Sequence, residues 1–382
     1  MAFKLLTIIG ARPQIIKASA ISRAIRTHFS NEIQEIIVHT GQHYDENMSE
    51  QFFSELEIPQ PEYNLNVGSG NHGAQTAKMT AGIEELLIKE SPNALLVYGD
   101  TNSTLAGALA ASKIGIPVVH VEAGLRSFNK EMPEEINRIL CDHISTLLFC
   151  PTKQAIENLQ NEGFKTSEEK AYINHPKYFL CGDIMYDNSM HFSEVSDKDS
   201  TLIAELGLTP DNYILSTIHR NANTDIPANL IGIFSALESI QQSSGQAIVL
   251  PLHPRTKKFL HDLIDEPKIK AALDNPNIHI IPPAGFLDII ALEKNASLIV
   301  TDSGGLQKEA FFFHKPCIIL REQTEWVEIV ENGNAITVGA DEAKIIEAYK
   351  QLSTKTDYSY PPLFGDGKAA EFICQTLLNE LA

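Results

Sequence analysis

Short apolar runs alternate with helical stretches along most of the chain. In the first half, the strand-like runs lie at 5–9, 36–39, 95–98, 118–121 and 147–150. In the second half, they lie at 214–217, 247–250, 278–281, 298–300, 317–320 and 335–338. Strands separated by helices of this length are typical of βαβ units, in which a parallel sheet is covered on both faces. The pattern therefore predicts an α/β fold with two successive doubly wound domains.

The composition changes between residues 163 and 211, where Lys, Glu, Ser and Asp dominate around one strand-like run at 178–181. We place an interdomain linker at 183–200 in this region. A further helix is expected at 46–56, and a last one at 368–381 follows the Pro361-Pro362 break. Two successive doubly wound domains leave one natural place for a ligand, the cleft between them.

Composition and charge narrow the class of protein. A chain of 382 residues exceeds the roughly 250 to 300 residues at which single cores stop growing. Its net charge of -19 argues against a nucleic-acid surface, although local cations can still bind an anionic small molecule. The five cysteines include no C-x-x-C pair, which favours free thiols in a reducing compartment. With no apolar run near the roughly 18 residues of a membrane span, we expect a cytoplasmic protein that binds no membrane.

Three acids follow strand-like runs or open a helix close to two arginines. Asp100 and Glu122 come just past the runs at 95–98 and 118–121, and Glu134 opens a helix behind Pro133. Ligands of open parallel sheets bind outside the carboxyl ends of the strands. Because Arg126 and Arg138 are close by in the sequence, these acids predict an acid/base site beside an anionic ligand.

Each of these acids also has a structural alternative. Glu134 and Arg138 are four residues apart and could form only a helix-surface pair, while Asp100 and Glu122 could cap neighbouring turns. Three acids at one sheet edge, near two arginines, favour a site instead. No spacing matches a metal-ligand motif, a nucleophile elbow or a P-loop, which leaves proton transfer as the expected chemistry.

A second motif, Ser303-Gly304-Gly305, stands at a strand-to-helix joint in the second half. Glycines there let the backbone approach a ligand, and the free N–H groups of the helix start favour a phosphate. The alternative is a plain tight turn. Glu309, one turn further on, could accept a hydrogen bond from a ribose hydroxyl or be a solvated helix residue.

Cations and histidines stand at other strand ends. Arg12 and Lys17, around the turn Gly10-Ala-Arg-Pro13, could bind a diphosphate, or they could be solvated cations of a surface helix. His219 follows the run at 214–217 and could transfer protons near neutral pH, or be a structural histidine. His253 has the same character at the next strand end.

The combined motifs resemble the non-hydrolysing UDP-N-acetylglucosamine 2-epimerase family over about residues 4 to 340. The matching segments are, in order, GARPQIIKA, TGQHYDENM, YGDTNSTLAG, HVEAGLRS, MPEEINR, STIHRNAN, LPLHPR and VTDSGGLQKEA. The resemblance implies a GT-B fold of two Rossmann-like domains with the active site in the cleft between them. It also implies a UDP-sugar substrate, no redox cofactor and no metal, and a homodimer.

By this resemblance, residues 1–184 carry the sugar site and the acids, with the helix at 366–382 packed back on them, and residues 185–365 bind UDP. The implied reaction inverts C2 of the sugar by proton removal, elimination of UDP to a 2-acetamidoglucal, and re-addition. The implied catalytic residues are Asp100, Glu122, Glu134 and His219. The implied substrate-binding residues are Arg12, Lys17, Arg138, Phe286, Ser303, Gly304, Gly305 and Glu309.

Three departures from the family pattern bear on the sugar. Gln14 replaces an acid, HRNAN lacks a Glu of the common form, and Trp326-Val replaces Arg-Pro in the TERPE segment. With GARPQ, they resemble the subgroup that acts on UDP-2,3-diacetamido-2,3-dideoxy-glucuronate. They also bear on whether an allosteric substrate site near Gly41-Gln42-His43 is present. Two other readings are a GT-B glycosyltransferase with a UDP-sugar donor and a catalytically silent nucleotide-sugar-binding protein.

Overall fold

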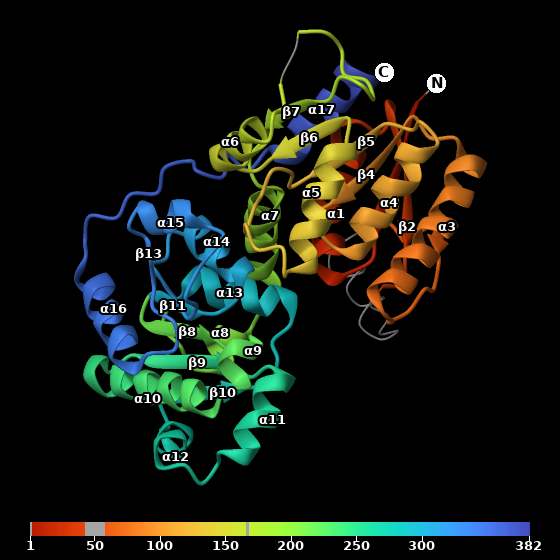
Figure 1. Cartoon of the computed structure of the whole chain (residues 1–382). Helices are drawn as coiled ribbons and strands as arrows, with labels where there is room; N and C mark the ends of the chain where they lie inside the picture. Colours follow the sequence, from red (N-terminus) through yellow and green to blue (C-terminus); the bar gives the residue numbers. More distant parts are fainter. Residues whose placement is uncertain (1, 43–57, 166–167) are drawn as a thin grey trace. The chain divides into compact units, whose positions relative to one another are not determined.

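The computed structural model describes residues 2–42, 58–165 and 168–382. The chain forms two compact units, which are treated one at a time below (Figure 1). Unit 1 comprises Met1–Asn188 and Pro362–Ala382, and unit 2 comprises Ser189–Pro361. The helix expected at 46–56 and the predicted His43 lie outside the described residues. The ligand roles assigned to 1–184 and 185–365 stay predictions.

Unit 1 is built on a parallel sheet of seven strands in the order β3-β2-β1-β4-β5-β6-β7. Its strands are β1 (Phe3–Ile9), β2 (Ile33–His39), β3 (Tyr63–Asn64), β4 (Ala94–Tyr98), β5 (Val118–Val121), β6 (Leu147–Cys150) and β7 (Lys177–Leu180). All were predicted except the two-residue β3. Because the strand order reverses between β1 and β4, the loops after these strands flank a switch point, where such sheets bind ligands.

Helices flank the unit 1 sheet, as alternating βα units require. They are α1 (Arg12–His28), α3 (His72–Glu90), α4 (Asn102–Lys113), α5 (Pro133–Ile144), α6 (Lys153–Asn161) and α17 (Ala369–Leu381). Pro13 fits the first turn of α1, where a missing N–H is no loss. Gly107 of α4 lets that helix approach the sheet, since a Cβ there would lie 3.1 Å from Ile8 and 3.2 Å from Val97. Each fully buried aliphatic side chain of this core contributes about 1.5–3 kcal/mol.

The expected linker at 183–200 is instead a helix, α7 (Ile184–Asp199), along which the chain passes from unit 1 to unit 2. Polar residues in its first half are buried and hydrogen-bonded, which composition cannot show. Asn188 donates to the carbonyl of Ile16 at 2.6 Å and accepts from Ser19 at 3.0 Å. The polar sequence therefore fastens the end of unit 1 to α1.

Asp187 of α7 holds the start of α17. Its carboxylate accepts the backbone N–H groups of Ala369 at 3.1 Å and Ala370 at 2.8 Å. These are among the N–H groups that a helix start leaves without an internal partner. Burial raises the pKa of Asp187 to about 6, against the opposing effect of the two N–H groups. The neighbouring Asp183 raises it further.

Unit 2 contains a parallel sheet of six strands in the order β10-β9-β8-β11-β12-β13. The strands are β8 (Tyr213–Thr217), β9 (Ala247–Pro251), β10 (Ile278–Ile281), β11 (Leu298–Thr301), β12 (Cys317–Ile319) and β13 (Ala335–Thr337), all at the predicted runs. The helices are α8 (Leu202–Glu205), α9 (Asn221–Thr224), α10 (Pro227–Ser244), α11 (Pro254–Asp262), α12 (Pro267–Asp274), α13 (Phe286–Asn295), α14 (Gly304–Phe312), α15 (Val327–Glu331) and α16 (Glu342–Thr354). Here the strand order reverses between β8 and β11, so these two strands end at the switch point.

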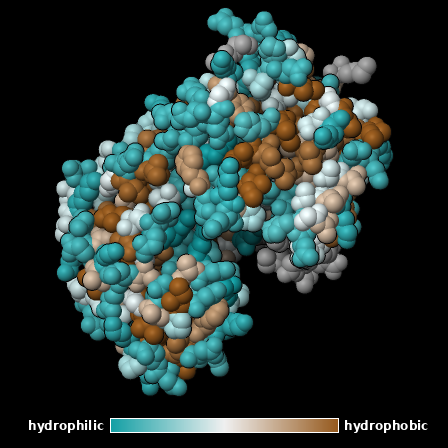
Figure 2. Space-filling view, in the orientation of Figure 1, coloured by the Kyte–Doolittle hydropathy of each residue, from teal (hydrophilic) through white to brown (hydrophobic). Residues whose placement is uncertain are grey.

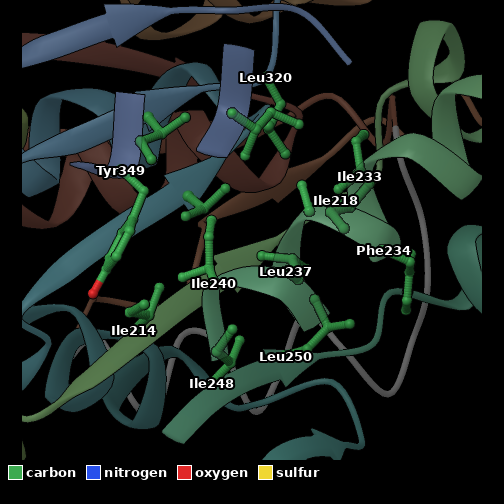
Figure 3. Close-up of a cluster of buried hydrophobic side chains, with 14 of the residues drawn as sticks. Ile214, Ile218, Ile233, Phe234, Leu237, Ile240, Ile248, Leu250, Leu320 and Tyr349 are labelled. Carbon is green, nitrogen blue, oxygen red and sulfur yellow. The ribbon is translucent and has the colours of Figure 1, made fainter. Parts of the chain in front are cut away.

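The unit 2 core forms where α10 lies on the sheet (Figure 3). Ile233, Leu237 and Ile240 of α10 are buried against Ile214 and Ile248 of the strands. Their spacing of three and four residues places them on one helix face. This packing fixes the strand ends that carry the predicted phosphate site.

None of the helices formed by the described residues is long and apolar enough to span a lipid bilayer. The five cysteines are free, and all except Cys181 are buried.

The raised pKa of Asp187 predicts a pH-dependent contribution to stability. Its folded-state pKa of about 6 lies above the unfolded value, so its contribution is complete below pH ~4 and is lost as pH rises through 6. We expect the stability that Asp187 adds relative to Asp187→Ala to be about 1 kcal/mol larger at pH 5 than at pH 7. Urea unfolding followed by circular dichroism measures it. Glu194→Ala, at an exposed acid of the same helix, is the control. A difference independent of pH would contradict the prediction.

Candidate active site

Asp100 lies at the switch point of the unit 1 sheet, two residues after β4. Its carboxylate forms an ion pair with the guanidinium of Arg138, in the second turn of α5. Burial raises the pKa of Asp100, and nearby Glu122 raises it further, whereas Arg138 and Lys17 lower it. The net effect is a raised pKa, which brings this carboxyl closer to the range where it can both release and take up a proton.

Glu122 follows β5 directly and pairs with the ammonium of Lys17 in α1. Both side chains are largely buried, with 12% and 13% of their surface exposed. The backbone of Glu122 has φ +72°, in the left-handed region that side chains other than glycine rarely adopt. Strain of this kind is found where a surrounding structure fixes a functional side chain.

Gly99 leaves the space in which these groups meet. A Cβ at this position would lie 3.1 Å from Oε2 of Glu122 and 3.3 Å from Nζ of Lys17. Its φ of +60° also favours glycine. Asp100, Glu122, Lys17 and Arg138 therefore form one cluster, called the acid cluster below, from segments far apart in the sequence.

Glu134 and Glu135 differ in their surroundings. Glu134 is exposed in the first turn of α5, and its catalytic role stays a prediction. Glu135 is buried and accepts the backbone N–H groups of Ser127 and Phe128, each at 2.9 Å. It also accepts from Arg138 at 2.5 Å. Sequence reasoning missed Glu135, although its spacing of three residues from Arg138 is the available signal.

Arg126, unlike Arg138, is occupied by acids outside the acid cluster. Its guanidinium donates to Asp142 at 2.7 Å and to both carboxylate oxygens of Glu162 at 2.6 Å. The side chain is almost fully buried. The expectation that Arg126 would serve an anionic ligand beside Arg138 is therefore not supported by its contacts, which are those of a structural ion pair.

The turn before α1 is held by hydrogen bonds of the neutral side chain of Gln14. Gln14 donates to the carbonyl of Tyr98 at 3.1 Å and to Thr104 at 3.0 Å, and it accepts from the N–H of Ala11 at 3.2 Å. An ionised carboxylate could not donate to that carbonyl. Arg12, the first residue of α1, is exposed. Its ligand role stays a prediction.

Gln42, in the segment where an allosteric site was considered, supports the start of α4. Its amide oxygen accepts from the backbone N–H of Ser103 at 3.0 Å and from the Ser103 hydroxyl at 2.6 Å. These contacts give Gln42 a structural role at the first turn of α4.

In unit 2, Ser303 and Gly304 occupy the predicted strand-to-helix joint. Ser303 caps α14 after β11, and its N–H bonds the hydroxyl of Thr301 at 2.9 Å. A Cβ on Gly304 would lie 2.8 Å from Glu325 Oε1 and 3.7 Å from the guanidinium nitrogens of Arg220 and Arg321. Gly305 is the next residue of the helix. Glycine backbone, a helix start and two guanidinium groups together favour a bound phosphate.

His219 lies at the end of β8, the other strand of the unit 2 switch point. Its Nδ1 is 3.3 Å from the carboxylate of Asp302, and its side chain is 36% exposed. Burial lowers the pKa of His219, and His253 and Arg220 lower it too, although Asp302 opposes them. The lowered pKa favours the neutral imidazole near pH 7, which can accept a proton or donate a hydrogen bond from its ring N–H.

Asp302, which sequence reasoning missed, organises the loop that carries His219. Its buried carboxylate accepts the backbone N–H groups of His219 at 3.0 Å and Arg220 at 2.9 Å. It also accepts from the amide of Asn223 at 3.0 Å, which donates in addition to the carbonyl of Leu320 at 2.9 Å. The signal in the sequence is the Asp that precedes Ser-Gly-Gly directly.

Glu309 and Phe286 are both buried in unit 2. Glu309 is buried on α14, and burial together with Glu309 raises the pKa of Glu293 on α13. Phe286 is buried edge-to-face against Phe192, with ring centroids 5.1 Å apart. Their contacts to ribose and uracil stay predictions.

Trp326, the third departure from the family pattern, is buried. The ammonium of Lys308 lies 4.1 Å from its ring centroid, within the range of a cation–π contact. Trp326 therefore takes part in the internal packing of unit 2.

The family model of UDP-N-acetylglucosamine 2-epimerase matches residues 25–378. A UDP-N-acetylglucosamine 2-epimerase homolog of Methanococcus maripaludis is 48% identical over 98% of this chain and 99% of its own. The UDP-2,3-diacetamido-2,3-dideoxy-D-glucuronate 2-epimerase of Pseudomonas aeruginosa is also 48% identical, with the same coverage. A solved structure of the Methanocaldococcus jannaschii UDP-GlcNAc 2-epimerase, in complex with UDP-GlcNAc and UDP, has a TM-score of 0.83. It is 44% identical, over 99% of this chain and all of that one.

These findings and the two parallel sheets confirm the predicted α/β fold class of the GT-B type. They also agree with an isomerase instead of a glycosyltransferase or a silent binding protein. The chain belongs to the UDP-N-acetylglucosamine 2-epimerase family.

Proposed function

We propose that this protein is a non-hydrolysing 2-epimerase that interconverts the gluco and manno forms of a UDP-2-acetamido sugar. The observation that carries the proposal is the acid cluster. Two carboxylates from neighbouring strand ends, Asp100 and Glu122, are held near Arg138 and Lys17 in a partly buried position. Inversion at C2 needs a base and an acid on opposite faces of the sugar ring, and a pair of carboxyls can supply both.

The proposed reaction breaks and re-forms two bonds. One carboxylate takes the C2 proton, the C2 electrons form a C1–C2 double bond, and UDP leaves C1 with the bonding pair. The intermediate is a 2-acetamidoglucal. A carboxyl on the other face then donates a proton to C2, and a UDP oxygen re-forms the bond to C1. Protons, electrons and UDP balance, so no redox cofactor or metal is required.

The leaving UDP is assigned to unit 2. The helix start at Ser303 and Gly304, with Arg220 and Arg321 near it, favours the diphosphate. Neutral His219 is proposed to donate a hydrogen bond from a ring N–H to the departing diphosphate. Lys17 and Arg138 are proposed to bind the charged substrate, together with Arg12 and Glu309. Glu134 is proposed as a third catalytic acid.

The sugar is either UDP-GlcNAc or its 2,3-diacetamido uronate relative. Relatives with each of these names are 48% identical to this chain, so overall identity does not separate them. The acid cluster supports proton transfer at C2, which both substrates share. We therefore propose the 2-acetamido UDP-sugars as the substrate class.

Solvent exchange tests the proposed function directly. In D2O and with no acceptor present, we expect deuterium at C2 of the recovered UDP-sugar, for UDP-GlcNAc or for UDP-2,3-diacetamido-2,3-dideoxy-glucuronate. Mass spectrometry and proton NMR measure the exchange, and comparison of the two sugars identifies the substrate. Absence of exchange with both would contradict the proposal. In a parallel assay with an acceptor added, transfer of the sugar to that acceptor would indicate a glycosyltransferase.

Removal of either carboxylate should abolish turnover and leave nucleotide binding intact. We expect Asp100→Asn and Glu122→Gln each to lower the exchange rate by about 10²–10⁴-fold, the usual contribution of a proton-transfer group. The affinity for UDP, measured by calorimetry, should change less than about threefold, since UDP is assigned to unit 2. Glu131→Gln, at an exposed acid before α5, is the control. Loss of UDP binding would instead make these acids binding residues.

A homodimer is also proposed, on the basis of an apolar surface in unit 1. Figure 2 shows apolar side chains gathered over the region of α4 and α5. On α5, Ile136 and Leu140 are one turn apart and 44% and 46% exposed. Exposed apolar patches of this kind mark interaction sites.

We expect light scattering to give the mass of a dimer and Ile136→Asp with Leu140→Asp to give a monomer. Ile88→Asp, at a residue of α3 that is 65% exposed, is the matched control and should stay dimeric. A monomeric wild-type protein would contradict the proposal.

A further inference from the structure

His120 is a fully buried histidine in the middle of the unit 1 sheet, on β5. Its Nε2 lies 2.7 Å from the carbonyl oxygen of Gly99, and its Nδ1 lies 2.7 Å from Oδ1 of Asp142. A carbonyl oxygen only accepts hydrogen bonds, so Nε2 carries a proton. The side chain therefore ties β5 to the residue immediately before Asp100.

Asp142, on α5, connects the same histidine to the segment after Glu122. Its second carboxylate oxygen accepts the backbone N–H of Gly124 at 3.1 Å and Arg126 Nη1 at 2.7 Å. One fully buried carboxylate thus receives contacts from His120, Gly124 and Arg126. Two strand ends are tied to this single group: β4 through His120 and Gly99, and β5 through Gly124.

The backbone at these two strand ends does not adopt its ordinary conformations. Gly99, Glu122 and Gly124 all have positive φ, of +60°, +72° and +78°. Glycine adopts such a φ readily, whereas for Glu122 it is strained and persists only when surrounding contacts fix it. Gly124 also has no room for a side chain, because a Cβ there would lie 2.4 Å from the carbonyl oxygen of Ala155. The contacts that fix Gly99 and Gly124 therefore also restrain Asp100, which follows Gly99, and Glu122, two residues before Gly124.

We propose that His120 and Asp142 are positioning residues that set the relative placement of Asp100 and Glu122 for proton transfer at C2. This proposal rests on the proposed function. Neither residue acts on the substrate itself, since both side chains are fully buried. Their role is to hold one strand end against the other, so that the two carboxylates keep the spacing that opposite faces of one carbon require.

The hydrogen bonds of His120 and Asp142 allow a test in which one substitution creates an unfavourable contact and a second substitution removes it. In His120→Gln, the amide nitrogen can still donate to the Gly99 carbonyl, but the amide oxygen then faces the carboxylate of Asp142, where two acceptors oppose each other. In the double variant with Asp142→Asn, the Asn amide donates to that oxygen. Its own oxygen accepts from Gly124 and Arg126. Asp142→Asn alone also remains satisfied, because a neutral His120 can accept from the Asn amide.

We expect His120→Gln to lower the C2 exchange rate at saturating substrate at least tenfold, with KM and the affinity for UDP changed less than threefold. The double variant should recover most of this loss, and Asp142→Asn alone should lose less than threefold. Glu162→Gln is the matched control, because it weakens contacts of Arg126 and His143 and leaves the contacts of His120 in place, and it should exchange like the wild type. Circular dichroism and thermal unfolding show whether each variant is folded.

The outcomes separate failure of the proposed function from failure of the positioning role alone. If the wild-type protein exchanges no deuterium, the proposed function fails. If the wild type is active and folded His120→Gln is equally active, only the positioning role fails. A single variant that does not fold leaves the decision to the double variant. A double variant that unfolds, or that folds without recovering activity, would overturn the positioning role.

Discussion

Two carboxylates placed close together in a partly buried position are the constraint on which the rest of unit 1 depends. Burial and the neighbouring Glu122 both raise the pKa of Asp100, so the charged form of the pair is disfavoured unless cations lie nearby. Lys17 and Arg138 supply those cations from two different helices. Because Arg138 also binds Glu135, which holds the backbone of Ser127 and Phe128, the ion pairs determine the path of the loop before α5.

In unit 2, a single buried carboxylate holds the loop that carries a proposed catalytic residue. Asp302 is fully buried and receives backbone N–H groups from the loop that carries His219, along with the amide of Asn223. A carboxylate bonded in this way fixes the loop and draws the imidazole toward it, while burial keeps that imidazole neutral. In each unit, then, a buried acid outside the proposed chemistry positions residues that take part in it. Asp142 is proposed to position Asp100 and Glu122 in unit 1, and Asp302 holds the loop of His219 in unit 2.

The βα periodicity was sufficient to predict every strand except β3. It also predicted the joint at which Ser303 and Gly304 open α14. It also placed Asp100 and Glu122 at neighbouring strand ends, because parallel strands end at one edge of a sheet. It could not predict which acid of Glu134 and Glu135 is buried, since both stand in the same helical turn. Nor could it assign Arg126 to Asp142 and Glu162, because that contact depends on side chains from α5 and from the residue that follows α6. The polar helix α7 was taken for a linker since its buried hydrogen bonds arise only in the folded chain.

The departures from the family pattern acquire a physical explanation that bears on the sugar. Gln14 uses its amide on Ala11, Tyr98 and Thr104, and these contacts lie within unit 1. Trp326 is buried beside Lys308, within unit 2. Asn221, which stands where the common form has Glu, is exposed at the start of α9, while Asn223 of the same segment bonds Asp302 and Leu320. Gln14 and Trp326 therefore act on internal packing, so the resemblance of these two positions to a uronate-specific subgroup indicates shared scaffolding more directly than a shared contact with the sugar. The choice between the two sugars must then depend on side chains that reach the substituents at C3 and C5.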